Sequence, residues 1–340
     1  MPEPLLEVKN LKVHFPTEDG LVKAVDDVSF TIERGQTLGV VGESGSGKSV
    51  TFMTVMGLID RKKAHVEGEI IFAGRDLLKV PEEDMRHIRG EGMGMIFQDP
   101  MTSLHPYYKV GDQIAEAILT HREVPKSEAF EQAIAMLKTV GIPQPADRAR
   151  QYPHEYSGGM RQRAMIAMSL SLNPDLLIAD EPTTALDVTV QAQILELIAR
   201  LKDEFNIGVV LITHDLGVVH DVADRVQVMY AGRAVEQGTR AEVFSKPLHP
   251  YTWGLLESIT HVDKKGTRLV PIEGLPPSMI FVPPGCPFHP RCPHRFEPCD
   301  KDRPALTDRG GGHPEACHLA IEDKNRILAE REAGRRAASA

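Results

Sequence analysis

Residues 42–49, Gly-Glu-Ser-Gly-Ser-Gly-Lys-Ser, constrain the fold of this chain more than any other stretch. They follow an apolar run at 37–41 that is typical of a buried strand, and they lead into a helix expected at about 48–58. Glycines in such a loop let backbone N–H groups turn inward around a phosphate, and the helix presents its positive end to the same anion. We expect Lys48 to reach the β- and γ-phosphates of a nucleotide and Ser49 to bind Mg²⁺. An ordinary glycine-rich turn is the alternative, and the flanking strand and helix argue against it.

Length and charge limit the classes of protein that this chain can belong to. Its 340 residues predict one large domain with a smaller appendage. The formal net charge is −9 and no long basic stripe is present, so nucleic acid is not an expected partner. No window of about twenty residues is apolar throughout, and residues 1–4 lack the pattern of a secretion signal. We expect a cytosolic chain whose membrane-spanning partners, if it has any, are separate proteins.

Alternating apolar residues upstream of the loop predict antiparallel strands between residues 6 and 32, with a turn at 18–20. Phe15 lies near a strand end, where its ring could stack on a nucleobase or pack into the core. Further strands are expected at 66–72 and 92–97. Gln98 follows the second of them, at the edge where doubly wound sheets bind ligands; a loop residue that only makes hydrogen bonds is the alternative.

A helical block follows and reads as a subdomain inserted at about residues 105–172. Near its end, Ser157, Gly158, Gly159 and Met160 precede an apolar helix expected from Ala164 onward. Ser157 can cap that helix, and the two glycines leave its first amides uncovered. The sequence therefore offers a second helix N-terminus that can bind an anion.

Two adjacent acids, Asp180 and Glu181, end an apolar strand at 176–180. Desolvating such a pair costs several kcal/mol unless a cation or substrate compensates. Asp180 is expected to hold Mg²⁺ and Glu181 to polarise an attacking water. His214 ends the next strand, at 207–213, where it could contact a γ-phosphate or be an ordinary surface residue.

The phosphate loop, Tyr156-Ser157-Gly158-Gly159-Met160 before the paired acids, and His214 beyond them occur in the order typical of one family. Over roughly residues 5–240 the chain resembles the nucleotide-binding subunit of an ABC transporter. The resemblance implies a P-loop NTPase α/β core with an N-terminal antiparallel β subdomain and an inserted helical subdomain. It also implies ATP hydrolysis in a head-to-tail dimer, with each ATP held between the loop of one subunit and the Ser-Gly-Gly segment of the other.

The same resemblance implies a role for each matched residue. It assigns ATP binding to Phe15, Gly42, Glu43, Ser44, Gly45, Ser46, Gly47, Lys48, Ser49 and Val50. It assigns catalysis to Lys48, Gln98, Glu181 and His214, and Mg²⁺ binding to Ser49, Gln98 and Asp180. The partner's ATP is contacted by Ser157, Gly158, Gly159 and Met160, and Asp187 bridges the dimer. Tyr156 stands where the family usually has leucine, but the intact Ser-Gly-Gly segment still implies an active enzyme.

Residues 97–104, 179–187 and 249–252 resemble the dipeptide/oligopeptide importer subfamily more closely. That implies an ATPase that energises peptide import from the cytoplasmic face of the inner membrane. The implied partners are a second ATPase subunit, commonly a paralogue, two membrane-spanning permease subunits and an extracytoplasmic peptide-binding protein. Nickel or another small solute stays an alternative cargo, a soluble ATPase acting on nucleic acid is a weaker alternative, and a homodimer is an alternative to the heterodimer.

The four cysteines, Cys286, Cys292, Cys299 and Cys317, lie in a proline- and glycine-rich region. We expect a connecting helical segment at 241–262, a cysteine-rich domain at 263–322 and a charged, partly disordered tail at 323–340. The cysteine-rich part has too few apolar residues to fold by burial alone, so a bound metal would fix it. Four thiolates suit zinc or an iron–sulfur cluster. Some importer ATPases that this region resembles carry a [4Fe-4S] cluster there, which favours the cluster over zinc or four free thiols.

Overall fold

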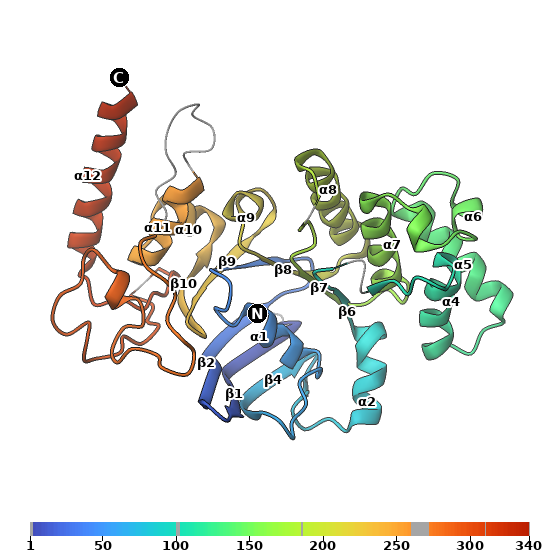
Figure 1. Ribbon diagram of the computed structural model, residues 1–340, viewed down its shortest axis with the longest axis horizontal. Helices are drawn as coiled ribbons and strands as arrows, with labels where there is room; N and C mark the ends of the chain where they lie inside the picture. Colours follow the sequence, from blue (N-terminus) through green and yellow to red (C-terminus); the bar gives the residue numbers. More distant parts are fainter. Residues whose placement is uncertain (1–2, 100–102, 185, 260–271, 310, 340) are drawn as a thin grey trace.

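The computed structural model describes residues 3–99, 103–184, 186–259, 272–309 and 311–339 (Figure 1). A four-stranded antiparallel sheet, in the order β2-β1-β4-β5, forms the N-terminal layer. Its apolar side chains point to one face and pack in a core that also contains Phe52 of the first helix. The strands are β1 (Leu6–Thr17), β2 (Gly20–Ile32), β4 (His65–Phe72) and β5 (Arg75–Asp76). This confirms the predicted antiparallel subdomain.

A six-stranded sheet, in the order β10-β9-β3-β8-β7-β6, forms the centre of the molecule. All of its neighbouring strands pair in parallel except β10 and β9. Every residue of β3, β6, β7 and β8 is buried, which explains their continuous apolar sequences. The strands are β3 (Thr37–Val41), β6 (Met93–Ile96), β7 (Leu176–Asp180), β8 (Gly208–Thr213), β9 (Arg225–Tyr230) and β10 (Arg233–Thr239). The parallel strands bring their carboxyl ends to one edge, where the phosphate loop, Gln98, Asp180, Glu181 and His214 follow them.

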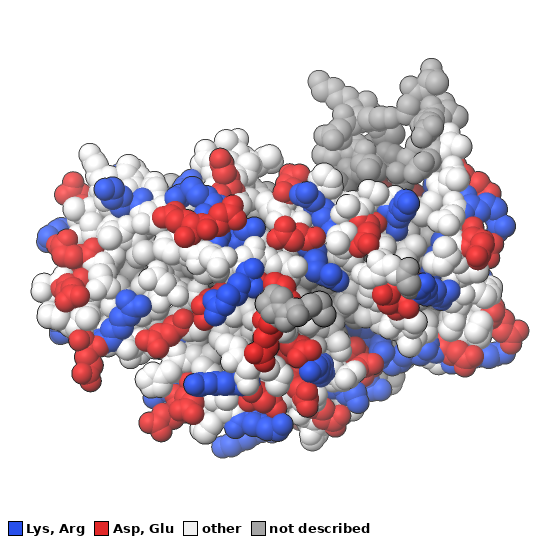
Figure 2. Space-filling view, turned by 180° about the vertical axis from the view of Figure 1, so that it is seen from behind, with Lys and Arg blue, Asp and Glu red and all other residues white. Residues whose placement is uncertain are grey.

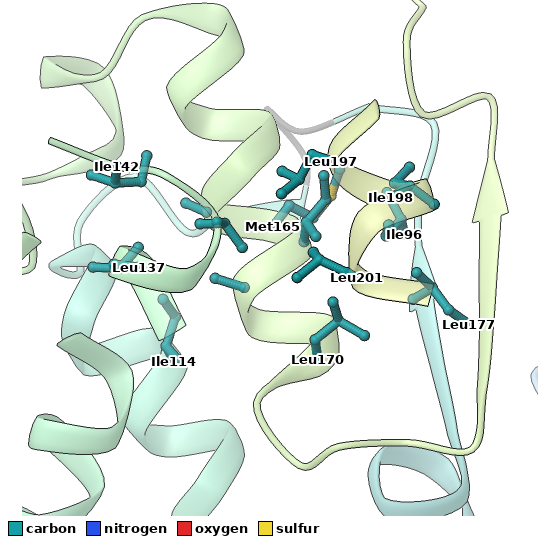
Figure 3. Packing of buried hydrophobic residues seen from close by; sticks show 14 of the residues in the cluster. Ile96, Ile114, Leu137, Ile142, Met165, Leu170, Leu177, Leu197, Ile198 and Leu201 are labelled. Atoms are coloured by element: carbon teal, nitrogen blue, oxygen red, sulfur yellow. The ribbon is translucent and has the colours of Figure 1, made fainter. Parts of the chain in front are cut away.

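The helical subdomain shares its core with one end of this sheet. Figure 3 shows Met165 between Ile114 and Leu137 on one side and Leu197 and Leu201, of a helix that covers this end of the sheet, on the other. Its helices are α4 (Val110–His121), α5 (Lys126–Thr139), α6 (Pro145–Arg148) and α7 (Gly158–Leu170), and the covering helix is α8 (Val188–Phe205). Because α7 begins at Gly158 rather than at the expected Ala164, the glycines form its first turn.

Two other helical segments differ from the sequence expectation. The helix α1 (Lys48–Val55) is shorter than the predicted 48–58, because Gly57 turns the chain with φ of +64°. The short helix α2 (Glu82–His87) was not predicted, nor was the turn Ile88–Gly92 after it, in which Arg89 and Gly90 leave helical geometry. Two further helices, α9 (Leu216–Val222) and α10 (Arg240–Ser245), flank β9 and β10.

The C-terminal part consists of α11 (Pro250–Ile259), a loop-rich stretch with the 3-10 turn His289–Arg291, and α12 (Ile321–Ser339), which extends away from the body (Figure 1). It joins the edge strand β10, since Ala316 donates its N–H to the carbonyl of Val235 at 2.9 Å. The first turn of α12 packs against the loop that contains Glu315. Lys324 is fully buried there, and its Nζ lies 2.6 Å from the Glu315 carboxylate. The sequence predicted a charged, partly disordered tail at 323–340, so this contact was missed. The predicted boundary at 262–263 lies outside the described residues.

None of the helices described has the length and apolar character needed to cross a membrane.

Candidate nucleotide-binding site

The phosphate loop turns tightly where β3 ends, and glycine is required at two of its positions. Gly42 and Gly47 have φ of +153° and +96°, a backbone region that side chains disfavour. A Cβ on Gly42 would lie 2.2 Å from the Met229 carbonyl oxygen, and one on Gly47 would lie 2.2 Å from the Ala24 carbonyl oxygen. The loop is thus packed against β2 and β9 so closely that only hydrogen fits at these two places.

The Lys48 ammonium lies inside the loop, and only 6% of the residue is exposed. Its Nζ donates to the carbonyl oxygen of Gly42 at 2.7 Å and to that of Glu43 at 3.0 Å. Burial lowers the pKa of Lys48, and the carboxylates of Glu181, Asp180 and Glu43 oppose that effect. The ammonium therefore sits among groups that keep its charge available to a phosphate.

Ser49 and Asp180 form the second contact of the site. The Ser49 hydroxyl donates to Oδ1 of Asp180 at 3.0 Å, which joins the start of α1 to the end of β7. Asp180 is 4% exposed, and this burial raises the pKa of its carboxyl although the Ser49 hydrogen bond lowers it. A hydroxyl and a carboxylate are hard oxygen ligands of the kind that Mg²⁺ takes. The donor set fits the predicted magnesium site.

Glu181 is held by side chains from three neighbouring segments. Gln98, after β6, donates Nε2 to Oε2 at 3.0 Å, and the Thr184 hydroxyl donates to the same oxygen at 2.9 Å. His214, after β8, places Nδ1 3.2 Å from Oε1. Burial raises the pKa of Glu181, but the hydrogen bonds from His214 and Thr184 outweigh it and leave the pKa below its usual range.

Glu181 also has an unusual backbone conformation, with φ of +47°. A non-glycine residue in this region is uncommon, and such residues gather at functional sites. The conformation turns the chain directly after the buried Asp180. It thereby sends two consecutive carboxylates to different partners, Asp180 to Ser49 and Glu181 to Gln98 and His214.

The Ser-Gly-Gly segment is presented on the surface. Ser157 and Gly158 are exposed, and the Ser157 hydroxyl caps α7 by accepting the Met160 N–H at 3.3 Å. Gly159 packs on α8, where a Cβ would lie 2.8 Å from Cγ1 of Val190. Asp187 is exposed and caps α8 through the Val190 N–H at 3.0 Å. Across the described chain, no hydrogen bond or ion pair joins these residues to the phosphate loop.

Two departures from the expected pattern have local explanations. Tyr156, in the place of leucine, is buried and its hydroxyl donates to the Arg148 carbonyl at 2.9 Å, so the substitution serves packing. Phe15 is half-buried in β1, opposite Val22, and packs against the core of the N-terminal sheet. Its stacking on a base stays a prediction.

The four cysteines come together around one cavity. Cys286, Cys292, Cys299 and Cys317 all line it, and the free space among them, about 10 Å³, is room for about one water. Burial raises the pKa of Cys292 to about 11 and that of Cys317 to about 12. Among the described residues, no group of three or more His, Cys, Asp or Glu side chains is arranged to hold a metal ion. The metal-bound C-terminal domain is not confirmed.

Two residues of the C-terminal part reach the phosphate loop and were missed as site residues. The Tyr251 hydroxyl accepts the backbone N–H of Glu43 at 2.8 Å, and the Arg291 guanidinium binds the Glu43 carboxylate at 2.7 and 2.9 Å. Residues 249–252 resemble the importer subfamily, and that resemblance assigns no site role to Tyr251. His249 accepts the Tyr251 N–H at 3.0 Å at the start of α11, and the tyrosine also contacts the loop.

The largely parallel sheet carries a phosphate loop after β3, paired acids after β7 and a histidine after β8, and a separate helix starts with Ser-Gly-Gly. This combination defines an ATP-binding cassette ATPase. The family model described as "ABC transporter" matches residues 25–184, and the one described as "Oligopeptide/dipeptide transporter, C-terminal region" matches residues 235–299.

Relatives and solved structures agree with this class. The dipeptide transport ATP-binding protein DppD of Bacillus subtilis is 52% identical, covering 93% of this chain and 95% of that protein. The oligopeptide transport ATP-binding protein OppD of Salmonella typhimurium is 51% identical, covering 94% and 95%. Among solved structures, a dimeric ATP-binding cassette bound to ADP and Pi has a TM-score of 0.62 at 25% identity, covering 69% of this chain and 98% of that one. CbiO1 of Clostridium perfringens, part of the cbiONQ transporter complex, has a TM-score of 0.62 at 28% identity, covering 72% and 92%.

This chain therefore belongs to the ABC transporter ATP-binding subunits, in their oligopeptide/dipeptide branch, and it is an ATPase. ATP and Mg²⁺ are the expected ligands of the class.

Proposed function

We propose that this chain hydrolyses ATP to power the import of dipeptides or oligopeptides across the cytoplasmic membrane. The observation that carries the proposal is the identity of about half of all residues, over nearly the whole chain, with proteins named for dipeptide and oligopeptide transport. The match of residues 235–299 to the C-terminal region of those transporters supports it. Nickel or another small solute is the alternative cargo, because an ATPase subunit of this kind does not itself hold the cargo.

Contacts near the loop support the roles in hydrolysis that we propose for Lys48, Ser49, Gln98, Asp180, Glu181 and His214. Residues Gly42 to Val50, with Lys48 as the cation, bind the phosphates, and Phe15 stacks on the adenine. Mg²⁺, when bound, neutralises charge on the β- and γ-phosphates. Ser49, Asp180 and Gln98 supply its protein oxygens. Glu181 accepts a proton from the attacking water, and its lowered pKa keeps it ionised for that role. His214 links Glu181 to the γ-phosphate position.

The surface position of the Ser-Gly-Gly segment supports a site that is completed by a second subunit. In the proposed dimer, Ser157, Gly158, Gly159 and Met160 cover the ATP bound to the partner, and the exposed Asp187 lies across the interface. The partner is a paralogous ATPase or a second copy of this chain. Two permease subunits and an extracytoplasmic peptide-binding protein complete the transporter, and this chain lies peripherally on the cytoplasmic face of the inner membrane.

The charge on the face drawn in Figure 2 gives no support to a function on nucleic acid. Figure 2 shows Lys and Arg side chains interspersed with Asp and Glu over the face drawn, rather than gathered in one basic patch. The net charge of −9 agrees.

We also propose that Cys286, Cys292, Cys299 and Cys317 hold a [4Fe-4S] cluster, with zinc as the alternative. All four cysteines line one cavity, which supports the proposal, and that cavity must widen to take a cluster because its free space holds about one water. Binding would deprotonate thiols that burial otherwise keeps neutral. Absorption spectra and metal analysis of anaerobically purified full-length protein test it. A brown protein with about four irons per chain supports the cluster, whereas a colourless protein with stoichiometric zinc, or with no metal, contradicts it.

Uptake by membrane vesicles that contain the intact transporter tests the transport function. ATP inside the vesicles should drive uptake of a labelled dipeptide or tripeptide delivered by the binding protein, and Glu181→Gln should abolish that uptake. A labelled nickel salt is the matched alternative substrate. ATP-driven uptake of nickel but not of peptides would contradict the proposal.

A further inference from the structure

The phosphate loop contains one acidic side chain, Glu43, and it is bound by the C-terminal domain. Arg291 donates from Nη1 to Oε2 at 2.7 Å and from Nη2 to Oε1 at 2.9 Å, the bidentate geometry of a strong arginine–carboxylate pair. The two residues are 248 positions apart in sequence. This pair is thus a direct tie between the end of the chain and the ATP site.

Arg291 is itself held firmly. Its side chain is 5% exposed, its Nε donates to the Glu273 carbonyl at 3.0 Å, and its Nη1 also donates to the Tyr230 hydroxyl at 3.3 Å. The guanidinium lies over the ring of Phe288, with its carbon 6.0 Å from the ring centroid. These contacts fix the guanidinium beside the loop. Arg291 is next in sequence to Cys292, one of the four cysteines that line the cavity.

The charge of Glu43 matters to the ligand. Its carboxylate acts electrostatically on Lys48, the cation of the loop. ATP brings several negative charges to the same loop, so an uncompensated Glu43 would repel it. Arg291 neutralises that carboxylate and binds it on the side of the C-terminal domain, while Tyr251 holds the backbone N–H of the same residue.

We propose that Arg291 is a positioning residue of the ATP site. By neutralising the Glu43 carboxylate, it lets the cysteine-rich C-terminal domain set the affinity of the phosphate loop for ATP. The role goes beyond transport itself and applies whatever the cargo and whether or not the cysteines hold a metal.

The test measures the dissociation constant of MgATP with purified full-length protein, and KM and kcat for ATP with the intact transporter. Arg291→Gln should weaken ATP binding about tenfold, or roughly 1.4 kcal/mol, through KM, with kcat changed less than about twofold. Arg291→Lys, which keeps the charge but loses the bidentate geometry, should weaken binding less. Removing the carboxylate as well, in Arg291→Gln with Glu43→Gln, should restore the affinity to within about twofold of the native value.

Arg303→Gln is the matched control, since Arg303 pairs with Asp26 of β2 at 3.0 Å but does not touch the loop. It should leave the ATP affinity unchanged. If Arg291→Gln does not fold, Glu43→Gln alone still tests the proposal. Charge neutralisation predicts that this variant binds ATP no more weakly than the native chain. A purely mechanical tie between Arg291 and the loop predicts that it binds ATP more weakly. An unchanged affinity in Arg291→Gln, no recovery in the double variant, or weaker binding in Glu43→Gln would overturn the proposal.

Discussion

Nδ1 of His214 lies 3.2 Å from Oε1 of Glu181 and joins the ends of two neighbouring parallel strands, β8 and β7. The contact couples the proposed water-activating carboxylate to a side chain that is largely exposed. Any displacement of the loop after β8 therefore changes the hydrogen bonding of Glu181. The pair is the part of the site through which the position of a γ-phosphate can act on the proposed base.

The pH dependence of hydrolysis should report the hydrogen bonds to Glu181. Because those bonds lower its pKa in the folded protein, the carboxylate stays ionised as the pH falls, until the lowered pKa is reached. Thr184→Val removes one of them, so the pKa of Glu181 should rise and the acid limb of the kcat profile should move to higher pH. Thr189→Val, at an exposed position in the first turn of α8, is the control and should leave the profile unmoved. A Thr184→Val profile that matches the native one would contradict the assignment.

Two glycine substitutions in the loop should distinguish the effect of a steric clash from that of an unfavourable backbone conformation. Gly47→Ala places a methyl group 2.2 Å from the Ala24 carbonyl, so ATP affinity should fall at least about a hundredfold. Gly45→Ala meets nothing within 4 Å, and only its φ of +76° is unfavourable, at about 1–2 kcal/mol. Equilibrium titration with a fluorescent ATP analogue compares the two. Equal losses of affinity would show that the crowding at Gly47 is not what matters.

The buried pair of Lys324 and Glu315 should stabilise the attachment of the C-terminal helix. Both side chains are fully buried, and Arg309 adds a contact to the same carboxylate at 3.2 Å. Although Nζ lies within ion-pair distance, its geometry is not that of a hydrogen bond, so the benefit is mainly electrostatic. Lys324→Met should lower the free energy of unfolding by about 2–3 kcal/mol in urea, since the buried carboxylate loses its nearest cation.

The control for that measurement is Arg326→Met, two residues further along α12, which breaks only an exposed pair with Asp323. It should cost less than about 0.5 kcal/mol. If both variants unfold at the same urea concentration, Lys324 does not stabilise the docking of α12.

Much of the site could be predicted from the sequence because its residues follow recognisable strands. Asp180 and Glu181 end a continuous apolar run, and Gln98 and His214 end two others. Because parallel strands align their carboxyl ends, local sequence patterns were enough to predict that these residues lie close together. The Ser-Gly-Gly helix start was also recognisable, although the glycines led us to expect the helix from Ala164 rather than from Gly158.

The contacts made by the C-terminal part could not be predicted in the same way. Glu43 and Arg291 are brought together by tertiary packing over 248 residues, and no periodicity marks either of them as a partner. Tyr251 lay in a motif that was recognised, but a helix-start position does not reveal where the hydroxyl points. Lys324 belongs to a helix rich in charged residues, whose docking depends on one acid from a distant loop.

ATP binding and hydrolysis by the Glu181→Gln variant test the central claim most directly. The substitution keeps the size of the side chain and removes the proton acceptor, so MgATP should bind about as tightly as to the native chain. Hydrolysis in the intact transporter should fall at least about a hundredfold, because general base catalysis contributes 10²–10⁴-fold. A variant that binds ATP and hydrolyses it at the native rate would contradict the account of this site.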